Sequence, residues 1–312
     1  AAVSGVSLVN SFNTIFINLF TALAAGGAVV ISQYIGRKDR ERASESATQL
    51  LVSSVLFSVV ISIVILLTNA SLMRLMFGRV EDDVMNACVT YLRISAYSYP
   101  ALAIYNAGAA LYRSFGKTST TMYISIIANV INVVGNCIGV FVLHAGIPGV
   151  AIPSLVSRTF SAVVITVLCF SKKNPVSYVS EWILRIDGGL QKKILRIAVP
   201  NGVESGVFQL VKVALSSVVA LFGTYQIAAN GVAQSIWSMA ALVCVTMGPV
   251  FITVIGQCMG AGDIAQAEMY FKKLTKITIG FAVLWNGIIF ALTPVLMSFY
   301  ALEPQTKRLT IL

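Results

Sequence analysis

The sequence is poor in charged residues and in histidine, and each shortage excludes a class of protein. Only 11% of the 312 residues are charged, while 57% are hydrophobic and the mean hydropathy is +0.85. A soluble domain has about 25% charged and about 45–50% apolar residues, so a water-soluble core cannot absorb this composition. The single histidine, His144, and the twelve acidic residues leave little for enzymes that rely on histidine or paired carboxylates. We therefore expect an all-α, multi-pass membrane protein that is not an enzyme.

Cysteine is also scarce, and the sequence has no motif for binding a cofactor. The five cysteines lie in apolar runs without CxxC or metal-ligand spacing, and we interpret them as small buried hydrophobic residues: Cys88, Cys137, Cys169, Cys244 and Cys258. No glycine-rich phosphate loop opens a helix, so we expect no cofactor. The net charge of +10 in so apolar a chain favours basic cytoplasmic loops over a nucleic-acid partner. The chain lacks an initial methionine and a signal peptide and ends abruptly at Leu312, so we expect a piece of a longer protein.

Long apolar runs dominate what is present. A bilayer core requires about 20 mostly apolar residues per helix. Eight segments meet this requirement and are predicted to span the membrane: 1–35, 50–73, 84–112, 120–143, 148–170, 197–221, 227–255 and 274–300. The breaks between these segments then alternate between the two sides of the membrane.

Basic residues gather in alternate breaks, and this bias predicts the orientation. Fifteen of the 22 lysines and arginines fall in the breaks 36–49, 113–119, 171–196 and 256–273 or, as Lys276, just beyond them. The opposite side holds Arg74, Arg79, Lys307 and Arg308, with Arg93 near it. By the positive-inside rule the first set of breaks is cytoplasmic. We therefore expect a multi-pass protein of the cell membrane, either an inner or a plasma membrane.

The longest break, 171–196, divides the predicted helices into five before it and three after it. Trp182, Leu184 and Ile186 lie among basic residues there, a composition typical of a short amphipathic segment at the membrane interface. We expect an N-terminal lobe at 1–170, a cytoplasmic linker at 171–196 and the start of a C-terminal lobe at 197–312.

An internal repeat relates two segments that lie 224 residues apart. Ile31, Gln33, Gly36, Asp39 and Ala43 match Ile255, Gln257, Gly260, Asp263 and Ala267, and Leu72-Met73 matches Leu296-Met297. We expect the glycine of each turn to end a helix in the left-handed conformation and the aspartate to cap the next helix. A recurrent turn would explain the central matches but not the flanking ones. Both copies point the same way through the membrane, which predicts a parallel repeat about an axis along the membrane normal, an arrangement found in secondary transporters.

Further motifs accompany the repeat: an Arg113–Gly116–Lys117–Thr118 turn, the asparagines Asn129, Asn132 and Asn136, the stretch 146–157 and a Pro200–Gly202–Glu204 helix start. In this order they resemble the multidrug and toxic compound extrusion family of cation-coupled antiporters, along essentially the whole chain. The resemblance implies twelve helices in two six-helix lobes, of which this chain would hold helices two to six and seven to nine. The missing first helix normally carries the acidic residue that binds the coupling cation, so this chain alone is not expected to transport.

Polar residues within a membrane are costly and point to function. Asn129, Asn132 and Asn136 share one helix face, and their carbonyls can replace water around Na⁺ or hydrogen-bond a carboxyl group. The alternative is that they only form hydrogen bonds between helices. The resemblance implies that Asn132 and Asn136, together with the hydroxyl of Ser154, bind the coupling ion, which is Na⁺ or H⁺.

Four further residues are candidates for a substrate cavity: Glu204, Gln209, Trp237 and Met239. A carboxylate at Glu204 would suit cationic compounds, although it could instead pair with the basic linker. Aromatic and methionine side chains accommodate varied ligands but also simply pack. Arg158 and Lys212 are interpreted as cations that snorkel or pair structurally.

The leading interpretation is a monomeric, cation-driven exporter of small amphipathic, often cationic, organic compounds that works by alternating access. A flippase for lipid-linked oligosaccharides would need a basic central cavity, for which only Arg158 and Lys212 are present. A non-transporting membrane scaffold would leave the buried polar residues without a purpose. The expected partners are therefore small-molecule substrates and the lipid bilayer.

Overall fold

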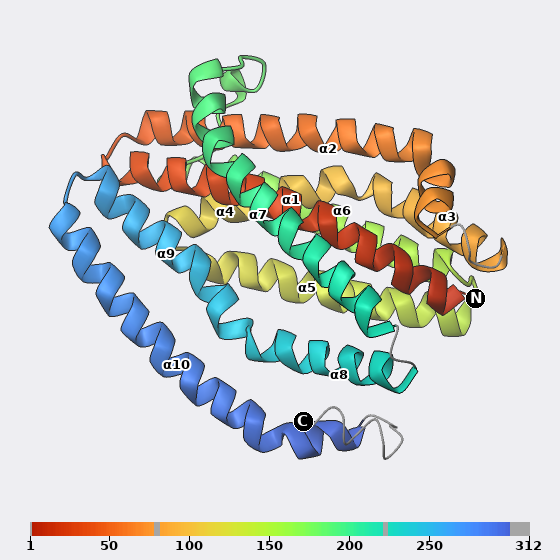
Figure 1. Cartoon of the computed structure of the whole chain (residues 1–312). Coiled ribbons are helices and arrows are strands. Elements are labelled where there is room, and N and C mark those ends of the chain that lie inside the picture. Colours follow the sequence, from red (N-terminus) through yellow and green to blue (C-terminus); the bar gives the residue numbers. More distant parts are fainter. Residues whose placement is uncertain (1, 78–81, 221–223, 300–312) are drawn as a thin grey trace.

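The computed structural model describes residues 2–77, 82–220 and 224–299, and all regular structure in these ranges is helical (Figure 1). The elements are α1 (Ala2–Gly36), α2 (Arg40–Phe77), α3 (Asp82–Tyr97), α4 (Tyr99–Ser114), α5 (Thr118–Cys137), the π-helix η1 (Ile138–Val142), α6 (Pro148–Cys169), the 3₁₀-helix η2 (Ser180–Trp182), α7 (Gly188–Ala220), α8 (Thr224–Ala240), α9 (Leu242–Gly260) and α10 (Ile264–Phe299). Six segments of these ranges are long and apolar enough to cross a bilayer: Phe12–Gly36, Arg40–Arg74, Thr118–Val142, Pro148–Cys169, Ala229–Gly260 and Ile264–Val295. The chain is a multi-pass, all-α membrane protein.

Six of the eight predicted spans correspond to these segments, whereas 84–112 and 197–221 do not. The prediction of one helix over 84–112 is wrong, because α3 ends at Tyr97 and α4 begins at Tyr99. Pro100 causes the break, since its ring nitrogen cannot donate a hydrogen bond to the Ala96 carbonyl. That carbonyl oxygen accepts a hydrogen bond from Ser62 Oγ of α2 at 2.9 Å instead. A polar side chain of a neighbouring helix therefore satisfies the interrupted backbone, as a membrane interior requires.

The predicted span 227–255 is also divided, because α8 ends at Ala240 and α9 begins at Leu242. Figure 1 shows a clear bend at this point. Just before the bend, the Met239 carbonyl oxygen accepts a hydrogen bond from Trp285 Nε1 of α10 at 2.8 Å. A side chain that enters the backbone hydrogen-bond ladder is a recognised cause of helix bends.

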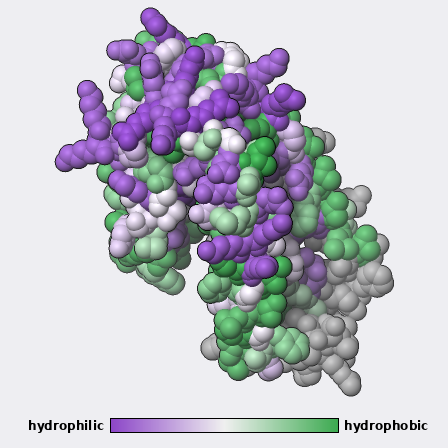
Figure 2. Space-filling model, turned by 90° about the vertical axis from the view of Figure 1, so that its left-hand side faces the viewer, coloured by the Kyte–Doolittle hydropathy of each residue, from purple (hydrophilic) through white to green (hydrophobic). Residues whose placement is uncertain are grey.

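Three helices begin well before their predicted apolar segments: α2 at Arg40, α7 at Gly188 and α10 at Ile264. Hydropathy marks the part of a helix that lies in the bilayer, whereas the helix itself continues into water. The predicted linker 171–196 therefore includes the first turns of α7. Figure 2 shows hydrophilic side chains gathered over the end of the bundle where these extensions lie. At this polar end, Gln257 Nε2 of α9 donates a hydrogen bond to the Ser114 carbonyl of α4 at 2.7 Å.

Helix α1 lies at the centre of the fold and packs against α2, α3, α4, α7 and α9. One apolar cluster joins it to α2, α4, α6 and α7 near the polar end and includes the fully buried Ile31, Leu50 and Ile165. A second cluster joins the other half of α1 to α2, α3 and α4 around Met73 and Tyr99. Helix α1 therefore connects both halves of the core.

The two copies of the repeat form matching turns. Asp39 Oδ1 accepts a hydrogen bond from the Arg42 backbone N–H at 3.0 Å, and Asp263 Oδ1 accepts one from the Gln266 N–H at 2.8 Å. Each aspartate thus caps the helix that follows it, because its carboxylate binds a free N–H group of the first helical turn.

The expected role of the two glycines is wrong. The residue with a left-handed backbone is Lys38 in the first turn, with φ +62°, and Gly262 in the second, with φ +78°. Gly36 and Gly260 are instead the last residues of α1 and α9. They are needed for a different reason, which is the close approach of these two helices.

Helices α1 and α9 cross where Gly36 and Gly260 face each other's chain. A Cβ atom on Gly36 would overlap the carbonyl oxygen of Gln257, and a Cβ atom on Gly260 would overlap that of Gln33. Because Gln33 and Gln257 are themselves repeat equivalents, the contact is reciprocal, as a local twofold relation requires. We call this contact the glycine crossing. It places the corresponding ends of both copies at the same end of the bundle.

The segment between α6 and α7 is fixed to α2 chiefly by Gln49, which is fully buried. Gln49 Nε2 donates hydrogen bonds to the carbonyls of Trp182, at 3.2 Å, and Arg185, while its Oε1 accepts from the Asp187 N–H at 3.3 Å and from Gln191 Nε2 at 3.0 Å. The N–H groups of Leu190 and Gly189 donate to the Asp187 carboxylate and hold its pKa below its ordinary value. Three more α2 side chains take part. Ser44 Oγ accepts a hydrogen bond from the Ser177 N–H, and Thr48 Oγ1 accepts one from the Val179 N–H. Ser53 Oγ donates one to Gln191 Oε1 at the start of α7. We call this arrangement the linker clamp.

Candidate functional site

A polar cavity of about 480 Å³ lies among α1, α3, α4, α5 and α6. Helix α5 contributes one continuous face to it, because Ser125, Asn129, Asn132 and Asn136 follow one another at helical spacing. Helix α6 contributes a second face with Ser154, Ser157, Arg158 and Ser161, and the remaining lining residues are Asn10, Tyr91, Leu102, Tyr105, Ala128 and Val150. Amides and hydroxyls therefore surround a space inside a bundle whose outer surface is apolar.

The structure brings the three predicted cation-site residues together. Asn136 Nδ2 donates a hydrogen bond to Asn132 Oδ1 at 3.1 Å, and Asn132 Nδ2 donates to Ser154 Oγ at 3.0 Å. The remaining acceptor, Asn136 Oδ1, is buried and has no hydrogen-bond partner. Such an oxygen is unfavourable unless a cation or a donor group meets it. Asn129 lines the same cavity.

Arg158 is the charged residue of this cavity, one helical turn after Ser154. Its Nη1 donates a hydrogen bond to Ser98 Oγ at 2.7 Å. Among the described residues, no carboxylate lies within 4 Å of its guanidinium. The arginine is thus held by a neutral partner at the break between α3 and α4 and leaves the cavity with a net positive charge.

Several lining residues were not predicted. Ser125 could have been found, because it precedes Asn129 by four residues on the same helix face. Tyr105 and Tyr91 gave no such signal, since they come from other helices. Tyr105 Oη lies 2.6 Å from Ser125 Oγ, and Tyr91 Oη donates to Asn10 Oδ1 at 3.1 Å. These pairs connect the far wall of the cavity with α5 and α1.

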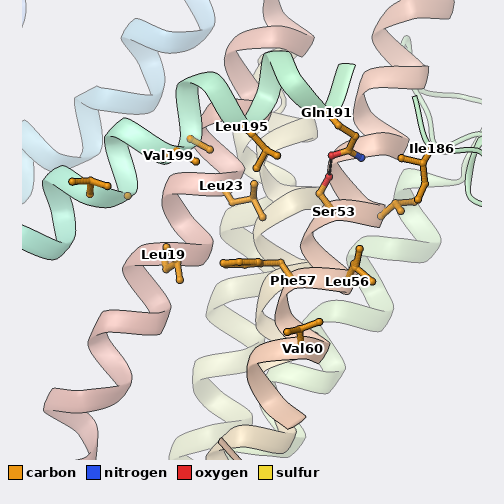
Figure 3. A pocket seen from close by; sticks show the side chains of 14 residues that line it. Leu19, Leu23, Ser53, Leu56, Phe57, Val60, Ile186, Gln191, Leu195 and Val199 are labelled. Carbon is orange, nitrogen blue, oxygen red and sulfur yellow. Dashed lines mark hydrogen bonds between the residues drawn. The ribbon is translucent and has the colours of Figure 1, made fainter. Parts of the chain in front are cut away.

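An apolar cavity of about 580 Å³ lies between α1, α2 and α7 (Figure 3). Leu19 and Leu23 of α1, Leu56 and Phe57 of α2, and Leu195 of α7 point into it. At one end of this cavity the Ser53 hydroxyl is hydrogen-bonded to the Gln191 side chain, as the dashed line in Figure 3 shows. The cavity therefore continues from the linker clamp into the apolar part of the bundle.

None of the four predicted substrate-cavity residues lines either of these two cavities. Glu204 is exposed and Gln209 half-buried on α7, while Trp237 and Met239 are about half exposed on α8. The structure therefore does not gather the four around one enclosed space, and the substrate cavity remains a prediction. Trp237 nevertheless meets α7, because its ring centroid lies 6.4 Å from that of Phe208.

The MatE family model matches residues 1–138 and 200–311. The chain belongs to the MatE family. The two matched blocks leave out α6, the segment between α6 and α7 and the first turns of α7, so the MatE signal lies on both sides of the predicted linker.

Curated relatives of this MatE chain include transporters and multidrug resistance proteins. It is 24% identical to the probable multidrug resistance protein YoeA of Bacillus subtilis, over 97% of this chain and 67% of the relative. It is 20% identical to a probable multidrug resistance protein NorM of Thermotoga maritima, over 97% of this chain and 66% of the relative. The chain thus spans about two thirds of the length of these relatives.

Solved MatE-like structures share the fold. An outward-facing multidrug resistance MATE transporter superposes with a TM-score of 0.89 at 21% identity, covering 99% of this chain and 69% of the other. A MOP superfamily transporter from Pyrococcus furiosus, described as having a binding pocket of reverse polarity, matches equally well, with the same TM-score, identity and coverage. The helices of this MatE chain are therefore arranged as in these two solved membrane transporters.

Proposed function

We propose that the chain is part of an antiporter that uses a Na⁺ or H⁺ gradient to export small amphipathic, often cationic, organic compounds. The observation that carries this proposal is the polar cavity, in which Asn136, Asn132 and Ser154 form a continuous hydrogen-bonded chain. A purely structural bundle gains little from burying these groups, because polar side chains within a membrane are costly. The multidrug resistance proteins among the relatives support efflux.

The cavity offers the neutral oxygen ligands that hard cations prefer. Amide and hydroxyl oxygens could surround Na⁺ at about 2.4 Å, which lies within the typical range of about 2.3–2.6 Å for Ca²⁺. The unpartnered Asn136 Oδ1 fits either such a cation or the proton of a carboxylic acid. Three neutral oxygens do not replace the hydration of an ion, and Arg158 adds a repelling charge. The proposal therefore requires an anionic partner from outside the described residues.

Alternating access needs two parts that move against each other, and we assign these parts to 1–170 and 197–312, joined by the linker. Helix α1 belongs to the first part and α9 to the second, so the glycine crossing lies between them. Small residues at a helix contact let the two backbones approach closely. The two parts therefore meet here through backbone atoms, and we infer that movement between them passes through this contact.

A flippase for lipid-linked oligosaccharides is the alternative that fits the same fold. Its pyrophosphate group would require several cations around one cavity. In the described chain, Arg158 lines the polar cavity, whereas Lys212 lies over the Trp237 ring. This separation of the two cations favours efflux. A non-transporting scaffold is disfavoured because it does not need a polar cavity.

Replacing Asn136 by alanine in the full-length protein is expected to reduce cation-driven efflux about 5- to 150-fold. The variant loses an oxygen of the site and the hydrogen bond to Asn132, and one such loss is worth about 1–3 kcal/mol. Transport of a fluorescent cationic dye in vesicles with an imposed Na⁺ or pH gradient measures the effect.

Asn136→Asp is expected to shift the pH dependence of transport, because a carboxyl group in this cavity can titrate.

Asn286→Ala is the matched control, because, among the residues that the structure describes, the Asn286 amide donates a hydrogen bond only to the Ala282 carbonyl of its own helix, at 2.8 Å. This control is expected to keep the parental rate. Parental efflux by Asn136→Ala, at equal amounts of inserted protein, would show that the asparagine face only packs between helices.

The orientation can be tested by cysteine labelling in a cysteine-free background of intact cells. Cysteines placed at Lys38, Lys117 and Lys192 are expected to be protected from impermeant thiol reagents, because basic segments stay cytoplasmic. Cysteines placed at Asp82 and Gly146 are expected to react. Labelling at Lys192 from outside would contradict both the orientation and the cytoplasmic position of the linker.

A further inference from the structure

Lys212 of α7 lies against two aromatic rings. Its Nζ atom is 4.1 Å from the ring centroid of Trp237 on α8 and 5.3 Å from that of Phe208 on α7. The two rings are 6.4 Å apart and tilted by 32°. In the part of the chain that the structure describes, no carboxylate lies within 4 Å of this ammonium group. Aromatic faces, rather than a counter-ion, therefore hold the charge.

The rings are accessible rather than enclosed in a packed core. Phe208 is 50% exposed and Trp237 is 48% exposed, and Lys212 is itself half-buried. Glu204, Phe208 and Lys212 follow one another at intervals of four, so they share one face of α7. Glu204 is exposed and has no cation within 4 Å among the described residues. An unpaired carboxylate thus stands one helical turn from the first of the two rings.

This arrangement has the chemistry of a site for an organic cation. Aromatic faces attract ammonium groups, and aromatic surroundings are a recurrent means of binding quaternary ammonium compounds. A lysine within an apolar segment needs compensation for its lost hydration. Here the compensation comes from the same two rings that an external cation would use. The Glu204 carboxylate would attract such a cation. It lies on the same face of α7 as Lys212, which competes with the cation for the rings.

We propose that Phe208 and Trp237 bind the charged group of an organic cation, and that the Lys212 ammonium occupies this site as a tethered competitor when no such cation is bound. The inference rests on the proposed export of cationic compounds and names the residues that contact them. Glu204 draws the cation toward the rings, and Lys212 limits how tightly it is held. An exporter benefits from such a competitor, because a lysine that returns to the rings helps to displace the bound compound.

Replacing Lys212 by methionine in the purified full-length protein is expected to tighten the binding of tetraphenylphosphonium. A cation–π contact is worth about 0.5–2 kcal/mol, so removing the competitor should lower the dissociation constant about 2- to 30-fold. Lys212→Arg should stay near the parental value, because its guanidinium also stacks on aromatic rings. Adding Trp237→Leu to Lys212→Met should abolish the gain. Equilibrium dialysis with labelled tetraphenylphosphonium measures these constants without any ion gradient.

The matched control is Lys276→Met, which removes the same charge from an exposed position of α10. It is expected to leave the dissociation constant unchanged, and triphenylphosphine oxide, a neutral analogue, should not distinguish Lys212→Met from the parent. The inference would be overturned if Lys212→Met bound tetraphenylphosphonium no more tightly than the parent. It would also be overturned if Lys276→Met tightened binding as much as Lys212→Met, or if no variant bound the compound. Tightened binding without gradient-driven efflux would instead overturn only the proposed function.

Discussion

Replacing Gly36 by alanine is expected to destabilise the folded protein by about 2 kcal/mol, with a fall of several degrees in the melting temperature. The added Cβ atom would overlap the Gln257 carbonyl oxygen, so α1 and α9 would have to separate along the glycine crossing. Overpacking of this kind costs about 1–3 kcal/mol and occasionally more. The cost exceeds the gain of about 1 kcal/mol that alanine brings to a helix. Gly260→Ala should have the same effect, because its Cβ would overlap the Gln33 carbonyl oxygen.

Gly206→Ala is the matched control for this prediction. It lies within α7, and an added Cβ atom there meets nothing within 4 Å. It is therefore expected to keep or slightly raise the melting temperature. The melting temperatures of all three variants can be measured by heating the detergent-solubilised proteins and quantifying the remaining folded protein by size-exclusion chromatography. A Gly36→Ala protein as stable as the Gly206→Ala protein would contradict the close approach of α1 and α9.

Replacing Gln49 by leucine is expected to release the linker and to cost about 2–4 kcal/mol of stability. Leucine leaves four hydrogen bonds unmade, because the Trp182 and Arg185 carbonyls, the Asp187 N–H and the Gln191 amide lose their common partner. Each unsatisfied buried group costs about 1–3 kcal/mol, and water that enters the opened linker recovers part of the loss.

Limited trypsin digestion should reveal this release as faster cleavage after Lys172, Lys173 and Arg185. Gln234→Leu on α8 is the matched control, because the Gln234 side chain makes no hydrogen bond within the described chain and should leave cleavage unchanged. Parental cleavage rates in Gln49→Leu would show that Gln49 does not hold the linker in place.

Much of the architecture could be predicted from local patterns. Apolar runs located the membrane helices because burial in lipid demands them, and the spacing of Asn132 and Asn136 placed both on one helix face. The break at Ser98 also had a local signal in Pro100. The approach of α1 and α9 had one too, since Gly256 and Gly260 of α9 are four residues apart and a Cβ on Gly256 would lie 2.9 Å from Ser32 Cβ. Such small-residue pairs are typical of close helix contacts in membranes.

Other features had no local sequence signal, because they depend on contacts between helices that are distant in the sequence. The bend after α8 coincides with a hydrogen bond from Trp285 of α10, which no pattern around Ala241 indicates. Lys212 and Trp237 come from different helices, so their contact follows from the packing of α7 on α8. Helix ends were misplaced for a further reason, because hydropathy reports the lipid boundary and not the last backbone hydrogen bond.

The linker clamp also constrains the order in which the protein can be built. Its hydrogen bonds join residues 131 to 142 positions apart, for example Thr48 with Val179 and Gln49 with Gln191. During synthesis, α2 leaves the ribosome long before the linker exists, and α3, α4, α5 and α6 are made in between. Closing so long a loop costs only slightly more entropy than closing a short one. Thr48 and Gln49 lack their linker partners until residues 179–191 have been made, and docking of the linker then positions α7 against α1.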